Sequence, residues 1–291
     1  MAADPDLVFD RDFTAPYGVA VPLSALVTRV LAANPGPFTF RGTGTYLLGS
    51  QSGAVAVIDP GPDLPEHLAA LRRAIGTRPV SHILVTHSHR DHAEAAPALK
   101  AWSGAEIFAL AGAPQETAGS TGVEEAHVHR FAPDHLLRDG QVLAGDGFTL
   151  TCVATPGHTA AHACFALEEE GALFSGDHVM GWSTSVIAPP DGSIGAYLKS
   201  LERLIARGDA ILYPTHGGPI RQPREYLRAL LAHRRRREAE VLGAWQSGLR
   251  QADAIARRLY PHIAPGLGAA AAVQVRAHLE HLAQQGLIAP D

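Results

Sequence analysis

The sequence predicts an α/β fold followed by a small helical domain. Between residues 34 and 220, short apolar runs bounded by Gly, Pro, Ser and Asp alternate with stretches of helical period. Several of these runs end directly in His- or Asp-bearing turns, where open α/β sheets place their chemistry. From Pro223 onward the pattern is helical only. We therefore divide the chain into a larger domain of residues 1–222 and a C-terminal domain of residues 223–291.

The strands of the larger domain are predicted from apolar runs that end in turn residues. These runs are residues 45–49, 54–58, 82–86, 107–110, 148–154, 162–167, 172–175 and 210–213. Helical spacing predicts helices over residues 65–75, 91–102 and 197–206. Residues 111–135 have no clear period and are predicted to be a surface loop that forms a rim over a site.

Three helices are predicted in the C-terminal domain, over residues 223–247, 251–260 and 269–285, with a short strand at residues 286–288. Three helices followed by a β-turn form the outline of a winged-helix unit. Residues 221–291 contain eleven Arg and six acidic residues, which gives this segment a charge of +5. Because the net charge of the whole chain is −5, the remaining residues carry −10. Such a tail is compatible with a polyanion partner, but charge alone favours solvated helix faces.

The composition is that of a globular protein. The chain has 291 residues, of which 46% are hydrophobic and 18% are charged. No apolar run approaches the roughly 18 residues of a membrane helix, and the acidic N-terminus lacks the features of a secretory signal. The two cysteines, Cys152 and Cys164, exclude a disulfide scaffold and are expected to pack in strands. We therefore expect a cytoplasmic protein without a membrane partner.

The segment His87-Ser88-His89-Arg90-Asp91-His92 is the strongest functional motif. It follows an apolar strand and opens a helix. Imidazole and carboxylate groups are ligands that zinc prefers. Residues two apart in a turn can converge on one ion, and the next two can face a second ion beside the first.

Three further turns supply the ligands that a second metal would need. Each follows an apolar strand and is flanked by Gly or Pro, which allow a tight turn with space for an ion. They bring in His158 (Pro156-Gly157-His158), Asp177 (Ser175-Gly176-Asp177) and His216 (Thr215-His216-Gly217).

The order of these four motifs resembles the metallo-β-lactamase superfamily. The resemblance covers roughly residues 35–220 and implies a four-layer αββα sandwich with a dinuclear metal site at one edge of its two sheets. It implies that His87, His89 and His158 hold one metal, that Asp91, His92 and His216 hold the other, and that Asp177 bridges them. Two zinc ions are expected, with iron or manganese as alternatives. Such a pair shares a hydroxide and lowers its pKa, and the Asp91 carboxylate is the predicted catalytic group that orients it or takes its proton.

The remaining histidines are expected to have lesser roles. His162 and His178 are predicted to lie behind the ligands or at the substrate rim. His82 is expected in the core. His127, His129 and His135 are expected in the long loop, at plain surface positions or, as the alternative, in contact with the substrate.

Residues 34–62 and the helical tail resemble one branch of the superfamily, which includes animal mitochondrial endoribonucleases and carries a C-terminal winged-helix-like domain. The resemblance implies a phosphodiesterase or endoribonuclease acting on single-stranded RNA, and the basic tail agrees with it. An acyl or thioester hydrolase of the glyoxalase II type has the same metal motif and is the alternative, with weak β-lactamase side activity. A non-catalytic winged-helix binding protein is a third. The substrate is thus a small molecule or RNA.

Overall fold

The computed structural model describes residues 7–112, 127–128, 131–264 and 266–289. Its strands form two sheets. The first has the spatial order β1 to β7, namely β1 (Ala20–Pro22), β2 (Val27–Leu31), β3 (Gly44–Leu48), β4 (Val55–Ile58), β5 (Val80–Val85), β6 (Ile107–Leu110) and β7 (His135–Leu137). The second has the order β12-β11-β10-β9-β8, formed by β8 (Val142–Ala144), β9 (Thr149–Ala154), β10 (Ala163–Leu167), β11 (Ala172–Gly176) and β12 (Ile211–Pro214).

The inner faces of the two sheets pack against each other around a shared core. Tyr46 and Leu84 of the first sheet meet Phe165 and Phe174 of the second in one buried cluster. The rings of Tyr46 and Phe174 lie 5.0 Å apart, centroid to centroid. Every residue of β3, β4, β10 and β11 is buried. Because these strands are covered on both faces, their sequences are nearly continuous apolar runs rather than alternating ones.

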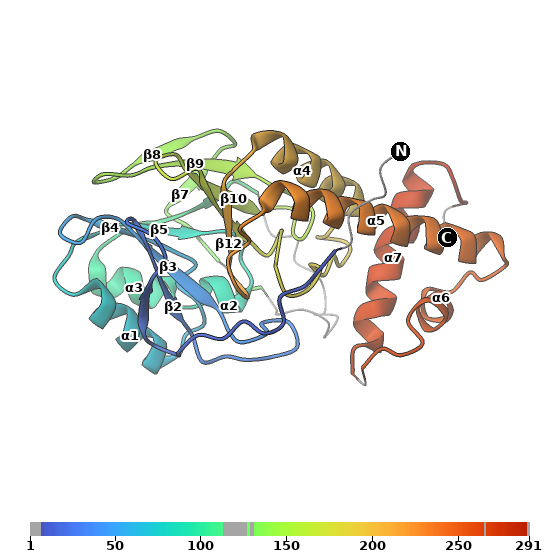
Figure 1. The fold of residues 1–291 in the computed structure, drawn as a ribbon, viewed down its shortest axis with the longest axis horizontal. Helices are drawn as coiled ribbons and strands as arrows, with labels where there is room; N and C mark the ends of the chain where they lie inside the picture. The colour runs from blue at the N-terminus through green and yellow to red at the C-terminus, as the bar shows by residue number, and fades with distance from the viewer. Residues whose placement is uncertain (1–6, 113–126, 129–130, 265, 290–291) are drawn as a thin grey trace.

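Helices cover the outer face of each sheet (Figure 1). Leu71 of α1 (Pro65–Ile75) and Leu99 of α3 (Ala96–Ser103) pack on the first sheet. Leu201 of α4 (Ile194–Arg207) packs on the second. The predicted four-layer αββα sandwich is thereby confirmed.

The C-terminal helices are α5 (Pro223–Gln246), α6 (Ala252–Leu259) and α7 (Gly268–Gln284), and they extend from one end of the sandwich (Figure 1). Leu227 of α5 packs with α4, whereas Val241 of the same helix packs with α6 and α7. The helix thus belongs to both packing units, and the domain boundary at residue 223 stays a prediction. No helix in the described part of the chain is long and apolar enough to cross a membrane.

Several elements differ from the sequence prediction. Residues 286–288 form a turn on the end of α7 instead of a strand, with the Leu287 amide bonded to the Leu282 carbonyl. The predicted helix 91–102 is divided into α2 (Arg90–Ala93) and α3, because the Ala95 amide donates to the Gly61 carbonyl and a proline opens the second helix. The strands β1, β2, β7 and β8 were not predicted. Three of them have three residues each, too few to show a period.

Acidification is expected to destabilise the fold partly through His67 of α1. This imidazole is buried 2.9 Å from Thr45 Oγ1, and burial lowers the pKa of His67 from 6.5 to about 4. Below pH 6.5 the unfolded chain therefore takes up a proton on this histidine that the folded chain does not. The contribution of His67 to the free energy of unfolding is fully present above pH 6.5 and is lost as the pH falls towards the folded pKa of about 4. At about pH 5 the loss is about 2 kcal/mol.

His67→Gln should therefore reduce the stability difference between about pH 7.5 and about pH 5 by about 2 kcal/mol. Urea unfolding of both proteins at the two pH values, in the presence of a chelator, measures this difference in the free energy of unfolding. Equal pH dependence in the two proteins would contradict this account of His67.

Candidate metal centre

Three imidazoles converge at one end of the sandwich. His87 follows β5, His89 immediately precedes α2, and His158 lies in the turn after β9. His87 Nε2 lies 2.8 Å from His89 Nδ1, and His158 Nε2 lies 3.3 Å and 3.2 Å from these two atoms. Burial and then the neighbouring imidazoles hold the pKa of His87 and of His89 well below 6.5. Neutral ring nitrogens this close together fit the ligand set of one cation.

A second group lies beside the first. His216 Nε2 lies 3.0 Å from Asp91 Oδ2 and 3.4 Å from Asp177 Oδ1. His92 Nε2 lies 3.4 Å and 3.5 Å from the same two carboxylate oxygens. Burial opposes charge on these groups, but the two carboxylates outweigh it and raise the pKa of His92 and of His216, while the two imidazoles lower the pKa of both Asp91 and Asp177.

The buried polar atoms of this second group fit a metal. Asp91 Oδ1, Asp177 Oδ1, His92 Nε2 and His216 Nε2 are buried and, apart from the imidazole–carboxylate ion pairs given above, form no hydrogen bond of good geometry with the described residues. An unsatisfied buried polar atom costs about 1–3 kcal/mol. Coordination to cations would satisfy all four atoms at once.

All seven predicted ligands therefore lie in one cluster. Their ligand atoms form three overlapping groups, in each of which all atoms lie within 4.8 Å of one another: His87 with His89 and His158, His87 with His92 and Asp177, and Asp91 with His92 and His216. Asp177 lies between the other two groups, as a bridging ligand would. Its bridging role stays a prediction.

Two glycines allow the turns that carry these ligands. Gly176 has φ +53°, and a Cβ there would lie 2.6 Å from His162 Nε2. Gly157 has φ +146°, and a Cβ there would lie 2.4 Å from the backbone of Tyr197. A side chain would therefore clash with His162 at the first position and with α4 at the second, next to the ligands Asp177 and His158.

Asp59 is a functional residue that the sequence reasoning missed. This fully buried carboxylate follows β4 and accepts a hydrogen bond from His92 Nδ1 at 2.8 Å. It also accepts from the Thr86 amide, from Thr86 Oγ1 and from Thr215 Oγ1, at 2.7 to 3.0 Å. Asp59 thus fixes the ring of His92 and joins the turns after β5 and β12. An acidic residue directly after an apolar strand was the available signal.

His162 and His178 take different positions. His162 is buried, with Nδ1 2.8 Å from Thr155 Oγ1, and its Nε2 accepts from the Asp177 amide at 3.3 Å. It therefore lies directly behind the ligands. His178 is also buried, but its ring packs on that of Tyr197 at 4.4 Å and it does not line the pocket described below. Of the two positions predicted for His178, behind the ligands or at the substrate rim, the contact with Tyr197 of α4 agrees with the first.

The other histidines need correction. His127 is close to the site rather than on a plain surface, since its Nδ1 lies 2.7 Å from Ser88 Oγ and its ring 4.5 Å from that of His89. His135 lies in β7 and stacks on Phe108, and His82 is half-buried against the same ring. His129 lies outside the described residues.

A pocket of about 460 Å³ opens over the ligands. His89, Asp91, His158 and Asp177 form its polar base. Most of its wall comes from three segments that are distant in the sequence and mostly apolar: Pro37, Phe38 and Phe40; Met180 and Trp182 to Val186; and Tyr260, Ile263, Leu267, Ala270, Ala271 and Gln274 of the C-terminal domain. The rings of Phe40 and Trp182 stack at 4.8 Å.

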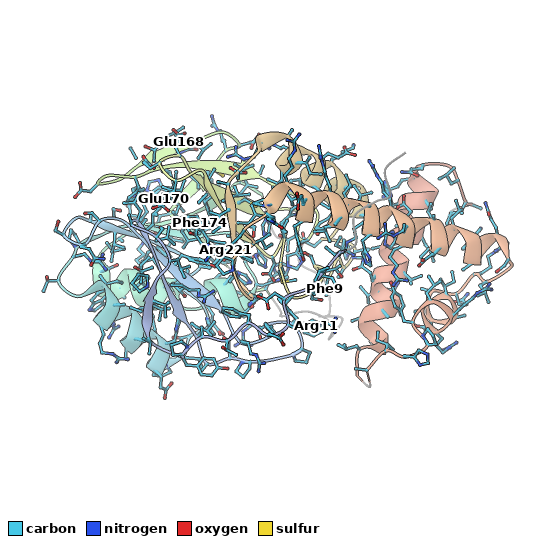
Figure 2. The ribbon with its side chains drawn as sticks, in the orientation of Figure 1. Phe9, Arg11, Glu168, Glu170, Phe174 and Arg221 are labelled. Carbon is cyan, nitrogen blue, oxygen red and sulfur yellow. The ribbon has the colours of Figure 1, made fainter. Side chains whose placement is uncertain are left out.

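The N-terminal segment closes one side of this pocket. Figure 2 shows Phe9 and Arg11 on this segment, between the sandwich and the C-terminal helices. The Asp10 amide donates to the Gly181 carbonyl, which holds the segment on the pocket loop. Arg11 is the one Lys or Arg that lines the pocket among the described residues.

Comparison with known proteins agrees with this arrangement. The profile of the metallo-beta-lactamase superfamily matches residues 39–216, and that of the beta-lactamase associated winged helix domain matches residues 252–291. The Beta-lactamase-like protein 2 homolog of Caenorhabditis elegans is 35% identical over 222 residues, or 76% of this chain and 71% of that protein.

Two fungal proteins are similar over a smaller share of their length. Lactamase-like protein nscB of Neosartorya fischeri is 36% identical over 225 residues, which cover 76% of this chain and 62% of that protein. Atrochrysone carboxyl ACP thioesterase AgnL7 of Paecilomyces divaricatus is 34% identical over 227 residues, which cover 76% of this chain and 65% of that protein. The chain thus spans less than two thirds of each.

Solved structures show the same architecture. The metallo-beta-lactamase family protein TTHA1429 from Thermus thermophilus superposes with a TM-score of 0.75 at 27% identity, covering 91% of this chain and 95% of that one. TTHA1623, solved in a di-iron-bound form, superposes with a TM-score of 0.52 at 27% identity, covering 68% and 96%. The chain belongs to the metallo-beta-lactamase superfamily and carries the winged helix domain that is associated with it.

Proposed function

We propose that this chain is a dinuclear metal-dependent hydrolase of acyl thioesters that carry a bulky apolar acyl group. The observation that carries this proposal is the pocket, whose base is formed by four members of the His/Asp cluster and whose walls are mostly apolar. Apolar walls of this kind bind an acyl chain by removing its surface from water. The similarity to a protein named as an acyl carrier protein thioesterase supports the same class of substrate.

The seven ligands would hold two metal ions, with His87, His89 and His158 on one, Asp91, His92 and His216 on the other, and Asp177 between them. Zinc is proposed because imidazole and carboxylate suit it, with iron or manganese as alternatives. When bound, such a pair lowers the pKa of a water molecule towards neutrality and polarises the scissile carbonyl.

The residues of the chain supply position and proton transfer. The apolar walls hold the acyl group and exclude bulk water from the carbonyl. Asp91 lines the base of the pocket, and the one of its two carboxylate oxygens that does not bind a metal would take the proton of the attacking water. The water oxygen bonds to the carbonyl carbon, the C–S bond breaks, and the proton passes to the leaving thiolate.

The basic tail supports an RNA substrate less strongly than its composition alone suggests. Arg235 pairs with Glu202, Arg237 pairs with Glu240, and Arg234 is buried. These three arginines are therefore engaged within the chain. Cleavage of single-stranded RNA stays a prediction, and the substrate panel described next includes an oligoribonucleotide to test it.

The test is a substrate panel with the zinc-reconstituted protein. An apolar acyl-coenzyme A thioester, S-lactoylglutathione, a single-stranded oligoribonucleotide and nitrocefin are compared with and without chelator. We expect chelator-sensitive thiol release to be fastest from the apolar acyl thioester. Faster cleavage of the oligoribonucleotide would overturn the acyl proposal in favour of the phosphodiesterase. No hydrolysis of any substrate by a metal-loaded protein would favour the non-catalytic binding protein.

The C-terminal wall of the pocket is expected to set the acyl preference. Ile263 lines the pocket and is 39% exposed, so a substitution there should not disturb the fold. A large apolar contact is worth about 1.5–3 kcal/mol, so Ile263→Glu should raise KM for the apolar thioester about 10–100-fold while leaving an acetyl thioester unaffected. Leu287→Glu, at an exposed position of the same domain outside the pocket, is the matched control. Equal effects of Ile263→Glu on both substrates would refute an acyl-binding role for this wall.

A further inference from the structure

One arginine of the run at residues 234–237 is directed inward from α5. Arg234 is 2% exposed, and its Nη2 donates to the Ser185 carbonyl. Its guanidinium carbon lies 4.9 Å from the centre of the Tyr197 ring. Among the described residues it has no carboxylate partner. Burying a guanidinium without a carboxylate partner costs free energy, so net stabilisation does not explain its position.

Arg234 contacts the loop that positions two of the metal ligands. Ser185 Oγ donates to the Asp177 carbonyl at 2.5 Å and lies 2.9 Å from the His178 carbonyl, which also accepts from the Tyr197 hydroxyl at 2.8 Å. Ser185 therefore holds the backbone of the residue that carries the Asp177 carboxylate.

The next residue along the loop orients another ligand. His158 Nδ1 donates to the Val186 carbonyl at 2.7 Å, which directs His158 Nε2 at the other two imidazoles. The carbonyl that Arg234 holds belongs to the peptide that joins Ser185 to Val186. A shift of this peptide would move the acceptor of His158 and the support of Asp177 together.

We propose that Arg234 is a positioning residue through which the C-terminal helix α5 sets the geometry of the metal centre. It acts on His158 through the 185–186 peptide and on Asp177 through Ser185, and it touches neither ligand itself. The proposal rests on the metal site of the proposed function and is independent of its substrate. The proposal also assigns different roles to members of the arginine run. Arg234 is directed towards the metal centre, whereas Arg235 and Arg237 form ion pairs on the surface.

The test compares Arg234→Met with Arg234→Lys in the full chain, with Arg235→Gln as the matched control on an exposed neighbour. Zinc affinity is measured by competition with a chromophoric chelator, and ligand geometry by the visible absorption of the cobalt-substituted protein. We expect Arg234→Met to weaken zinc binding about 10-fold, at the lower end of the range for residues behind metal ligands, and to change the cobalt spectrum. Arg234→Lys keeps a donor for the Ser185 carbonyl and should recover much of the zinc affinity and of the wild-type cobalt spectrum. Arg235→Gln should change neither the zinc affinity nor the spectrum.

A lower thermal midpoint in Arg234→Met, with wild-type zinc affinity and cobalt spectrum, would show a merely structural role and overturn the proposal. If this variant does not fold, Ser185→Ala decides instead, because it removes the hydroxyl that supports Asp177 while Arg234 remains. Unchanged affinity and spectrum in Ser185→Ala would then overturn the proposal. These measurements use no substrate, so they are separate from a failure of the thioesterase panel.

Discussion

Replacing Asp177 by alanine is expected to lower kcat/KM about 10³-fold or more and to remove at least one metal ion per chain. Its Oδ1 lies 3.5 Å from His92 Nε2 and 3.4 Å from His216 Nε2, within the group that joins the two halves of the centre. Loss of this carboxylate removes a ligand and a negative charge. One catalytic ion supplies several kcal/mol of transition-state stabilisation, and about 4 kcal/mol corresponds to about 10³-fold. Hydrolysis rates and elemental analysis measure the two effects.

His162→Ala is the matched control for Asp177→Ala. It removes the acceptor of the Asp177 amide without removing a ligand. The loss should be about 10–100-fold. If His162→Ala proved as damaging as Asp177→Ala, the assignment of the ligands would be wrong.

Replacing Asp59 by asparagine is expected to weaken metal binding about 10–100-fold, although Asp59 contacts no metal. The asparagine keeps the volume, but its NH2 group would replace one of the two acceptor oxygens with a donor. At the position of Oδ2 it would face His92 Nδ1 and Thr215 Oγ1, so that His92 loses the partner that fixes its ring. At the position of Oδ1 it would face the Thr86 amide, next to His87. Asp59→Ala goes further and leaves several buried donors unsatisfied, so it should also lower the free energy of unfolding by about 3–5 kcal/mol.

Chelator competition and urea unfolding measure these two effects of Asp59. Asp139→Asn, on a surface carboxylate that pairs with Arg203, serves as the control and should change metal affinity little. Wild-type metal affinity in Asp59→Asn would show that His92 is held by its other contacts and that Asp59 has no role in the centre.

The clustering of the seven candidate ligands was more predictable from the sequence than the pocket, because the information for it is local. Each predicted ligand follows an apolar strand within one short turn, and strands of a sandwich bring their ends to a common edge. Asp59 escaped because a single buried acid after a strand has no motif, and only the folded chain shows its bonds to His92, Thr86 and Thr215. The two sheets and their covering helices were predictable for the same reason, since β3, β4, β10 and β11 are continuous apolar runs.

The pocket could not be predicted, because its walls come from residues about 37–40, 180–186 and 260–274, which no local pattern connects. The arginine run shows the same limit. Helical spacing establishes that at most about two of four consecutive residues share a face, but it does not say which face is buried. The packing of α5 on α4 turns Arg234 inward and leaves Arg235 beside Glu202.

The measurement that tests the central claim most directly is the metal content of the protein itself. The protein is reconstituted with excess zinc, desalted and analysed for zinc per chain. The cluster of His87, His89, Asp91, His92, His158, Asp177 and His216 predicts two tightly bound ions per chain, and fewer in Asp177→Ala. Recovery of the folded protein with no tightly bound metal would contradict the assignment of a dinuclear hydrolytic centre.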